Sequence, residues 1–84
     1  MTNAMNGPRI RLFGRTACSL CDVARDLVSE MCVEFDTTFE EIDVDTDPEL
    51  RAEYGELVPV VLVDGKQIGF WQIDPNRLRA ALQA

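Results

Sequence analysis

The stretch "LFGRTACSLCD" (residues 12–22) decides the fold, because it joins a predicted strand to a predicted helix and holds two of the three cysteines. Residues 9–13 alternate between polar and apolar side chains, which predicts a strand. From Leu20 onward, apolar residues recur at helical spacing, which predicts a helix of three to four turns. Cys18 and Cys21 therefore lie where the strand turns into the helix. The inward face of the helix is predicted to carry Leu20, Val23, Ala24, Leu27, Val28 and Met31.

The remainder of the chain predicts five further elements. Residues 38–45 are expected to form a second strand, and residues 47–55 a short helix with an aspartate cap and a terminal glycine. Residues 58–71 hold two strands around an Asp-Gly turn, the first of them apolar throughout and so expected to be central in the sheet. A last helix begins at Asp74. The order is β-α-β-α-β-β-α, and the first two strands should be parallel.

Length and charge limit the functions that are open to this chain. Its 84 residues are expected to form one domain over residues 9–84, preceded by a flexible leader at residues 1–8. A formal charge of −7 disfavours nucleic acids and anionic membranes as partners. No apolar run approaches the roughly twenty residues of a membrane span. We therefore expect a protein that binds neither.

The residue types restrict the chemistry to cysteine, carboxylates or backbone groups. The chain has no histidine, which removes the usual general base and the commonest metal ligand. Three cysteines, an odd number, fit a disulfide-stapled secreted scaffold poorly. The first residues also lack the apolar core of a signal peptide. These observations predict a cytoplasmic protein.

The position of the cysteine pair favours a redox role. Free backbone N–H groups and the positive end of the dipole stabilise an anion at a helix start, and a thiolate is such an anion. Such a place lowers the pKa of a thiol from about 8.5 to between about 3.5 and 7.5. Cys18 lies at the N-terminus of the predicted helix, and Cys21 lies one turn further along it. Arg15, three residues before Cys18, could bring a positive charge to the Cys18 sulfur. We interpret Cys18 as the attacking thiolate and Cys21 as the resolving thiol.

Three other interpretations of the pair are open. A zinc site normally takes four ligands, and this chain offers only three cysteines and no histidine, so no metal is expected. A purely structural disulfide would close so short a loop that it would constrain the unfolded chain little. An iron–sulfur or zinc dimer bridged through Cys18 is a further alternative. Cys32, at the end of the helical stripe, is interpreted as a small buried apolar residue.

These motifs together resemble a glutaredoxin-like member of the thioredoxin superfamily. The resemblance runs from Arg9 to Leu82 and rests on "LFGRTACSLCD" and on "LVPVVLVDGKQIGFW" (residues 57–71). The form C-x-Leu-C-acidic is similar to a group of short glutaredoxin-like proteins. The resemblance implies an α/β, thioredoxin-like fold with a central mixed four-stranded sheet flanked by helices.

The resemblance also implies roles for particular residues. It makes Cys18 the nucleophile and Cys21 the resolving residue. It implies a cis bond before Pro59, with Pro59 facing the cysteines and Val58 offering its backbone to an extended thiol substrate. With Arg15, these two residues are the predicted substrate-binding residues.

Two departures from the glutaredoxin pattern affect the choice of partner. Glutaredoxins usually carry proline and tyrosine between the cysteines, whereas this chain has Ser19 and Leu20. They also continue the fourth strand with two glycines and an acidic residue that hold glutathione. Here the residues that follow Gly69 are Phe70, Trp71 and Gln72. Glutathione is therefore expected to be a poor partner.

The sequence thus predicts a monomeric thiol–disulfide oxidoreductase or electron carrier without a cofactor. Its expected partners are a protein disulfide and an unidentified reductase. The alternative is a non-catalytic interaction module with a thioredoxin fold, in which Cys18 and Cys21 are merely structural.

Overall fold

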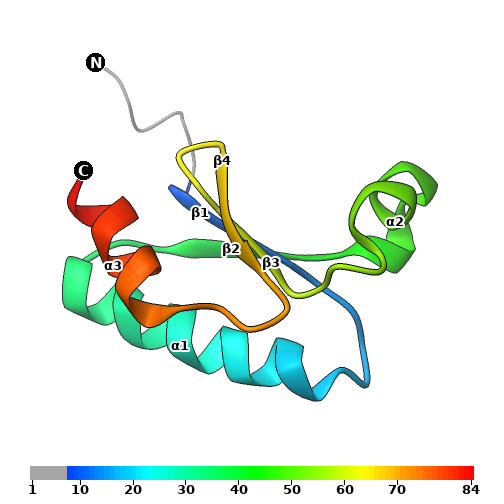
Figure 1. The fold of residues 1–84 in the computed structure, drawn as a ribbon, viewed down its shortest axis with the longest axis horizontal. Coiled ribbons are helices and arrows are strands. Elements are labelled where there is room, and N and C mark those ends of the chain that lie inside the picture. Colours follow the sequence, from blue (N-terminus) through cyan, green and yellow to red (C-terminus); the bar gives the residue numbers. More distant parts are fainter. Residues whose placement is uncertain (1–7) are drawn as a thin grey trace.

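A four-stranded sheet flanked by helices forms the centre of the computed structural model, which describes residues 8–84 (Figure 1). The elements in chain order are β1 (Ile10–Gly14), α1 (Ser19–Phe35), β2 (Phe39–Asp43), a 3₁₀ turn η2 (Val44–Thr46), α2 (Pro48–Tyr54), β3 (Val60–Val63), β4 (Lys66–Phe70) and α3 (Pro75–Gln83). Apart from the 3₁₀ turn, this is the predicted order. The leader predicted over residues 1–8 lies, except for Pro8, outside the described residues.

The sheet has the strand order β2-β1-β3-β4 and is mixed, as predicted. β1 pairs in parallel with β2 and antiparallel with β3, so that Leu12 lies opposite Val61. β3 and β4 form the hairpin around Asp64 and Gly65, both of which have positive φ. The crossover helix α1 connects the parallel pair and covers one face of the sheet (Figure 1).

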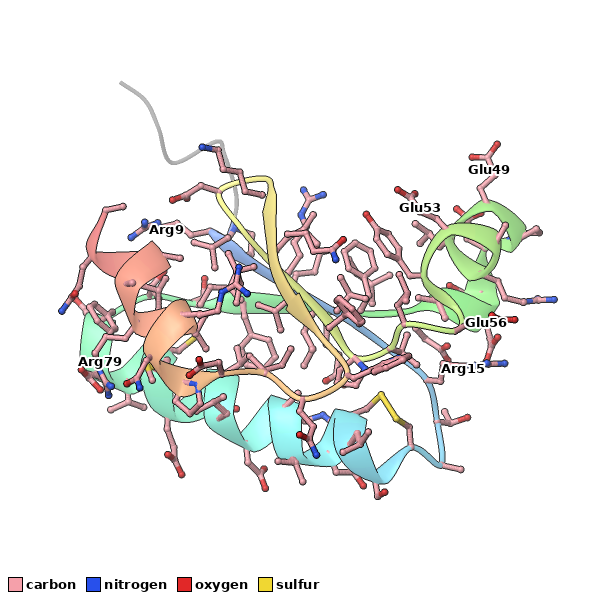
Figure 2. The ribbon with its side chains drawn as sticks, viewed as in Figure 1. Arg9, Arg15, Glu49, Glu53, Glu56 and Arg79 are labelled. Atoms are coloured by element: carbon pink, nitrogen blue, oxygen red, sulfur yellow. A yellow bond between two sulfur atoms is a disulfide. The ribbon has the colours of Figure 1, made fainter. Side chains whose placement is uncertain are left out.

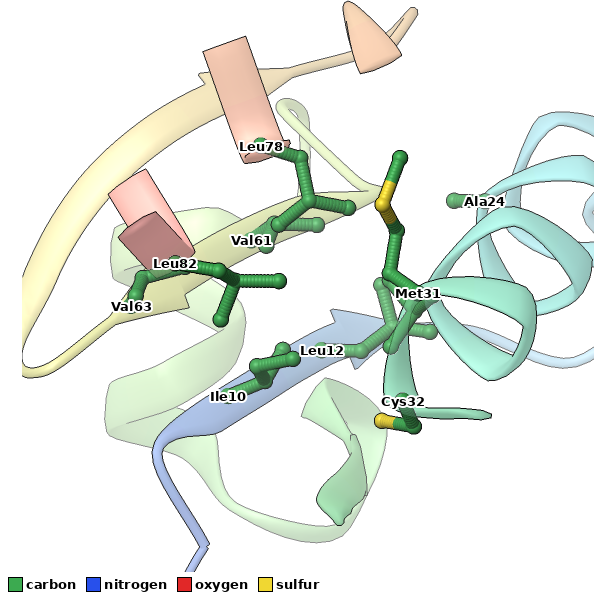
Figure 3. Packing of buried hydrophobic residues seen from close by; sticks show 10 residues of the cluster. Ile10, Leu12, Ala24, Met31, Cys32, Val61, Val63, Leu78 and Leu82 are labelled. Atoms are coloured by element: carbon green, nitrogen blue, oxygen red, sulfur yellow. The ribbon is translucent and has the colours of Figure 1, made fainter. Parts of the chain in front are cut away.

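The core has two parts on opposite faces of the sheet. The larger part lies between the sheet and helices α1 and α3 (Figure 3). Its buried members are Ile10, Leu12, Ala24, Val28, Met31, Cys32, Val61, Val63, Leu78 and Leu82. The smaller part has Phe13, Val44 and Val60 at its centre, and Phe13 stacks on Tyr54 of α2 with ring centroids 4.5 Å apart. The start of α1 and the loop before β3 both lie near the end of β1.

The structure corrects the predicted inward face of α1. Leu20 and Val23 are 40% and 64% exposed, whereas Cys21 and Cys32 are buried. The helix is turned so that its buried stripe is centred on Ala24 and Val28, which leaves the predicted edge residues in solvent. It is also longer than predicted, at 17 residues.

The two shorter helices, α2 and α3, have the N-cap residues that the sequence predicts. Asp47 caps α2 by accepting the N–H of Glu49, and Asp74 caps α3 by accepting the N–H of Asn76. The second strand is shorter than predicted, because Val44 begins the 3₁₀ turn instead of continuing the strand. The side chain of Val44 is fully buried. No helix within residues 8–84 is long and apolar enough to cross a membrane.

Candidate functional site

Cys18 is the N-cap residue of α1. Its backbone is extended, with φ −121° and ψ 108°, and its Sγ accepts a hydrogen bond from the N–H of Cys21 at 3.2 Å. Its carbonyl accepts the first backbone hydrogen bond of the helix, from the N–H of Asp22. Cys18 and Cys21 form a disulfide, with their Cα atoms 5.2 Å apart (Figure 2). One sulfur thus lies directly over free N–H groups of a helix start.

The two cysteines differ in exposure. Cys18 is partly exposed, whereas Cys21 is 1% exposed. The end of β1 makes room for the buried partner, because a Cβ on Gly14 would lie 3.3 Å from the Sγ of Cys21. Ala17, with φ 55°, turns the chain between the strand and the helix. Cys18 is therefore the more accessible residue of the pair.

The loop before β3 lies across from the cysteine pair. The Val58–Pro59 bond is cis, as the resemblance implies, and Pro59 is buried at the start of the strand. A hollow of about 600 Å³ is lined by both Val58 and Cys18, together with Ser19 and Leu20. A thiol that approached Cys18 through this hollow would pass Val58.

Arg15 lines the same hollow, but its charge is directed away from the sulfur. Its Nε lies 3.0 Å from Oδ2 of Asp45, and its Nη1 donates to the carbonyl of Gly55 at 3.3 Å (Figure 2). The Asp45 carboxylate is shared with Arg51, at 3.3 Å. Within residues 8–84, the hydrogen bonds of the Arg15 guanidinium go to these oxygens and not to Cys18. The predicted contact between Arg15 and the sulfur is therefore absent from this oxidised state.

Trp71 is a site residue whose structural role sequence reasoning missed. Its backbone N–H donates to the carbonyls of Pro59, at 2.9 Å, and Leu57, at 3.2 Å, and its indole Nε1–H donates to the carbonyl of Glu56, at 3.0 Å. It holds φ 60°, a left-handed conformation that is uncommon for a bulky residue. Trp71 thus ties the end of β4 to the loop that carries Val58 and Pro59. The only signal in the sequence was an aromatic pair, Phe70 and Trp71, at the end of the strand.

Cys32 lies away from this site, in the larger core cluster (Figure 3). Burial raises the pKa of its thiol. It is therefore less reactive than an ordinary exposed cysteine, in line with its interpretation as a core residue. Within residues 8–84, histidine, cysteine, aspartate and glutamate form no group of three that could hold a metal ion.

Comparison with known proteins yields a consistent set of similarities. The model of a family described as "Glutaredoxin-like domain (DUF836)" matches residues 9–83. An uncharacterized protein of Mycobacterium tuberculosis is 37% identical over 81 residues, which span 90% of this chain and 84% of the relative.

Solved structures agree with the family match. An X-ray structure of a protein from X. campestris is 32% identical, with a TM-score of 0.73, and the match covers 88% of this chain and 95% of that one. The structure of reduced Escherichia coli glutaredoxin is 26% identical, with a TM-score of 0.61, and the match covers 88% and 92% of the two chains. A glutaredoxin-like fold with a Cys18–Cys21 pair at a helix start supports a thiol redox role in general.

Proposed function

This chain belongs to the glutaredoxin-like domain family, and on that premise we propose that it is a thiol–disulfide oxidoreductase acting on a disulfide of a partner protein. The observation that carries the proposal is the asymmetry of the cysteine pair. Cys18 caps α1 and is partly exposed, whereas Cys21 is buried. An exposed sulfur at a helix N-terminus is suited to attack, and a shielded sulfur within disulfide distance is suited to resolve.

The exchange runs in two steps from the reduced protein. The Cys18 thiolate attacks one sulfur of the substrate disulfide, whose S–S bond breaks and releases one substrate thiolate. Cys21 then loses its proton and attacks the Cys18 sulfur of the mixed disulfide, which releases the second substrate thiolate. Two electrons pass to the substrate, and the two released thiolates take up the proton lost by Cys21 and one proton from solvent. A reductase then returns the Cys18–Cys21 disulfide to the dithiol.

Three residues near the cysteine pair are proposed to bind the substrate. Val58 lines the hollow beside Cys18 and has its backbone available to an extended segment, in the manner of strand addition. Pro59 has no N–H that would compete for the thiolate. Arg15 shapes the hollow through its bonds to Asp45 and Gly55, and its partly exposed guanidinium is available to an acceptor on the substrate.

The reactivity of the reduced protein towards iodoacetamide tests the nucleophile assignment. At mildly acidic pH we expect Cys18 to be alkylated much faster than Cys21 or Cys32, because its thiolate is stabilised by the helix start and the other two thiols are buried. Cys18 and Cys21 lie in one tryptic peptide, residues 16–25, so tandem mass spectrometry of that peptide after short exposure identifies the labelled residue. Slow labelling of Cys18, at the rate of a simple alkyl thiol, would instead favour a non-catalytic module with a structural pair.

Glutathione is expected to be a poor substrate partner. The side chains of Phe70 and Trp71 are 42% and 53% exposed where glutaredoxins carry a glycine-rich glutathione site. We expect slow turnover of a mixed disulfide of glutathione with a small thiol, but efficient reduction of a protein disulfide such as that of insulin. Both rates are measured with a dithiol as the terminal reductant. Turnover of the glutathione substrate at glutaredoxin rates would remove this part of the proposal.

We further propose that the protein works as a monomer in the cytoplasm. An odd number of cysteines, with Cys32 free and buried, fits a compartment that keeps thiols reduced. The reductase that completes the cycle is an unidentified partner.

A further inference from the structure

An apolar groove adjoins the hollow of Cys18. It has a volume of about 340 Å³ and runs between α1 and the segment after β4, lined chiefly by Leu20, Val23, Leu27, Trp71 and Ile73. Leu20 lines both the groove and the hollow, so the two form neighbouring parts of one surface. A segment bound in the groove would therefore lie next to the reactive sulfur.

The exposed apolar residues of the described chain concentrate at this surface. Five large apolar side chains within residues 8–84 are exposed: Leu20, Val23, Val33, Phe70 and Trp71. Three of them line the groove, and Phe70 contacts Trp71 edge to face, with ring centroids 5.2 Å apart. Only Val33 lies elsewhere, near the far end of α1. A contiguous apolar patch on a small protein marks a binding surface.

Acidic residues neighbour the groove residues along the chain. Asp26 and Glu30 are exposed on α1, each three residues after a groove residue and so one helical turn further along. Asp74 follows Ile73 directly and caps α3. Within residues 8–84, neither Asp26 nor Glu30 takes part in an ion pair. An apolar groove with exposed carboxylates one helical turn away is complementary to an apolar side chain flanked by basic residues.

We propose that the groove selects the substrate: a partner protein in which a bulky apolar residue, with lysine or arginine beside it, lies next to the reacting cysteine. The redox consequence of this binding rests on the proposed function. The apolar side chain enters the groove, the basic side chain meets Asp26 or Glu30, and the cysteine sulfur reaches Cys18. The Cys18 thiolate then displaces one substrate thiolate, and Cys21 displaces the other, so that a dithiol and a disulfide exchange two electrons and two protons.

Binding is tested first without redox chemistry. The probe is a linear peptide with serine in place of the reacting cysteine, followed by leucine and lysine; the control peptide has serine and glutamate at those two positions. Trp71 is the only tryptophan and lines the groove, so its fluorescence reports binding. We expect saturable binding of the leucine–lysine peptide, weakened by salt, and none of the control. Equal responses to the two peptides would overturn the proposal.

Matched variants on one helix then locate the surface. Val23→Ser should weaken binding of the leucine–lysine peptide about fivefold, because it removes apolar contact area. Val33→Ser makes the same change at a residue 84% exposed and outside the groove, and should leave binding unaltered. Likewise, Asp26→Asn with Glu30→Gln should weaken binding and reduce its salt dependence, whereas Glu49→Gln with Glu53→Gln on α2 should not. Equal effects of the groove and control variants would overturn the assignment of this surface.

A kinetic comparison separates this inference from the proposed function. With a disulfide made from the cysteine form of the leucine–lysine peptide, Val23→Ser should lower kcat/KM about fivefold, but leave reduction of 2-hydroxyethyl disulfide unchanged. If the unaltered protein reduces neither disulfide, the redox function fails, while the fluorescence titration still decides whether the groove binds the peptide. If both are reduced but Val23→Ser matches Val33→Ser, the groove does not select the substrate.

Discussion

Cys18→Ser is expected to reduce protein disulfide reduction to the background rate, a loss on the order of 10³-fold or more. A serine hydroxyl in the same N-cap position can still accept the N–H of Cys21, so the helix start should remain formed. It has no thiolate at neutral pH, and the first step of exchange needs one. The measurement is the initial rate of insulin reduction with a dithiol reductant, with circular dichroism to show that the fold is retained.

Two further cysteine variants make this result specific. Cys21→Ser should still attack the substrate but should stall as a mixed disulfide on Cys18, which is detected as a mass increase that a reductant reverses. Cys32→Ser should keep most of the exchange activity, because this residue lies in the core away from the pair. If Cys18→Ser retains substantial activity, or if Cys18→Ser rather than Cys21→Ser traps the substrate as a mixed disulfide, the roles of the two cysteines are wrong.

Local sequence signals account for most of the fold. The caps at Asp47 and Asp74 and the Asp-Gly turn at residues 64–65 each act within a few residues of chain, and the structure has all three. The apolar run of β3 indicated a central strand, and the strand order confirms it. Such features were predictable because their hydrogen bonds and steric limits involve neighbouring residues only.

Long-range contacts account for what the sequence did not predict. Leu20 and Val23 share the helical spacing of Ala24 and Val28, but the packing of the sheet against α1 decides which part of a wide apolar stripe is buried. This is why a groove beside the cysteines was not foreseen. Spacing alone assigned the α1 residues of this groove to the core.

The site shows the same limit in its polar contacts. Arg15 stands three residues before Cys18 in the sequence, which predicted an approach to the sulfur. In the fold its guanidinium instead meets Asp45 and Gly55, thirty and forty residues away. The hydrogen bonds that tie Trp71 to the loop before β3 are also formed only once the β3–β4 hairpin has closed. No pattern of neighbouring residues encodes such pairings.

Leu12→Ala is expected to lower the free energy of unfolding by about 2–5 kcal/mol. Leu12 is fully buried in the central part of β1, opposite Val61, within the cluster that joins the sheet to α1 and α3 (Figure 3). Small domains are stable by only about 5–15 kcal/mol in total, so this loss is a large share. The measurement is urea unfolding of the oxidised protein, followed by circular dichroism. Because β1 also carries Gly14 against Cys21, we expect slower disulfide exchange at temperatures near the lowered unfolding midpoint.

Two controls show whether the loss comes from the core. Leu12→Met keeps nearly the same volume and should cost less than about 1.5 kcal/mol. Val33→Ala removes apolar atoms from an exposed position of α1 and should change stability by no more than about 0.5 kcal/mol. A loss below about 1 kcal/mol for Leu12→Ala would contradict this account, since it is below the range measured for emptying a packed core position. The sheet would then not be held against α1 through Leu12, and the placement of Cys18 at the end of β1 would depend on the loop at residues 15–17 instead.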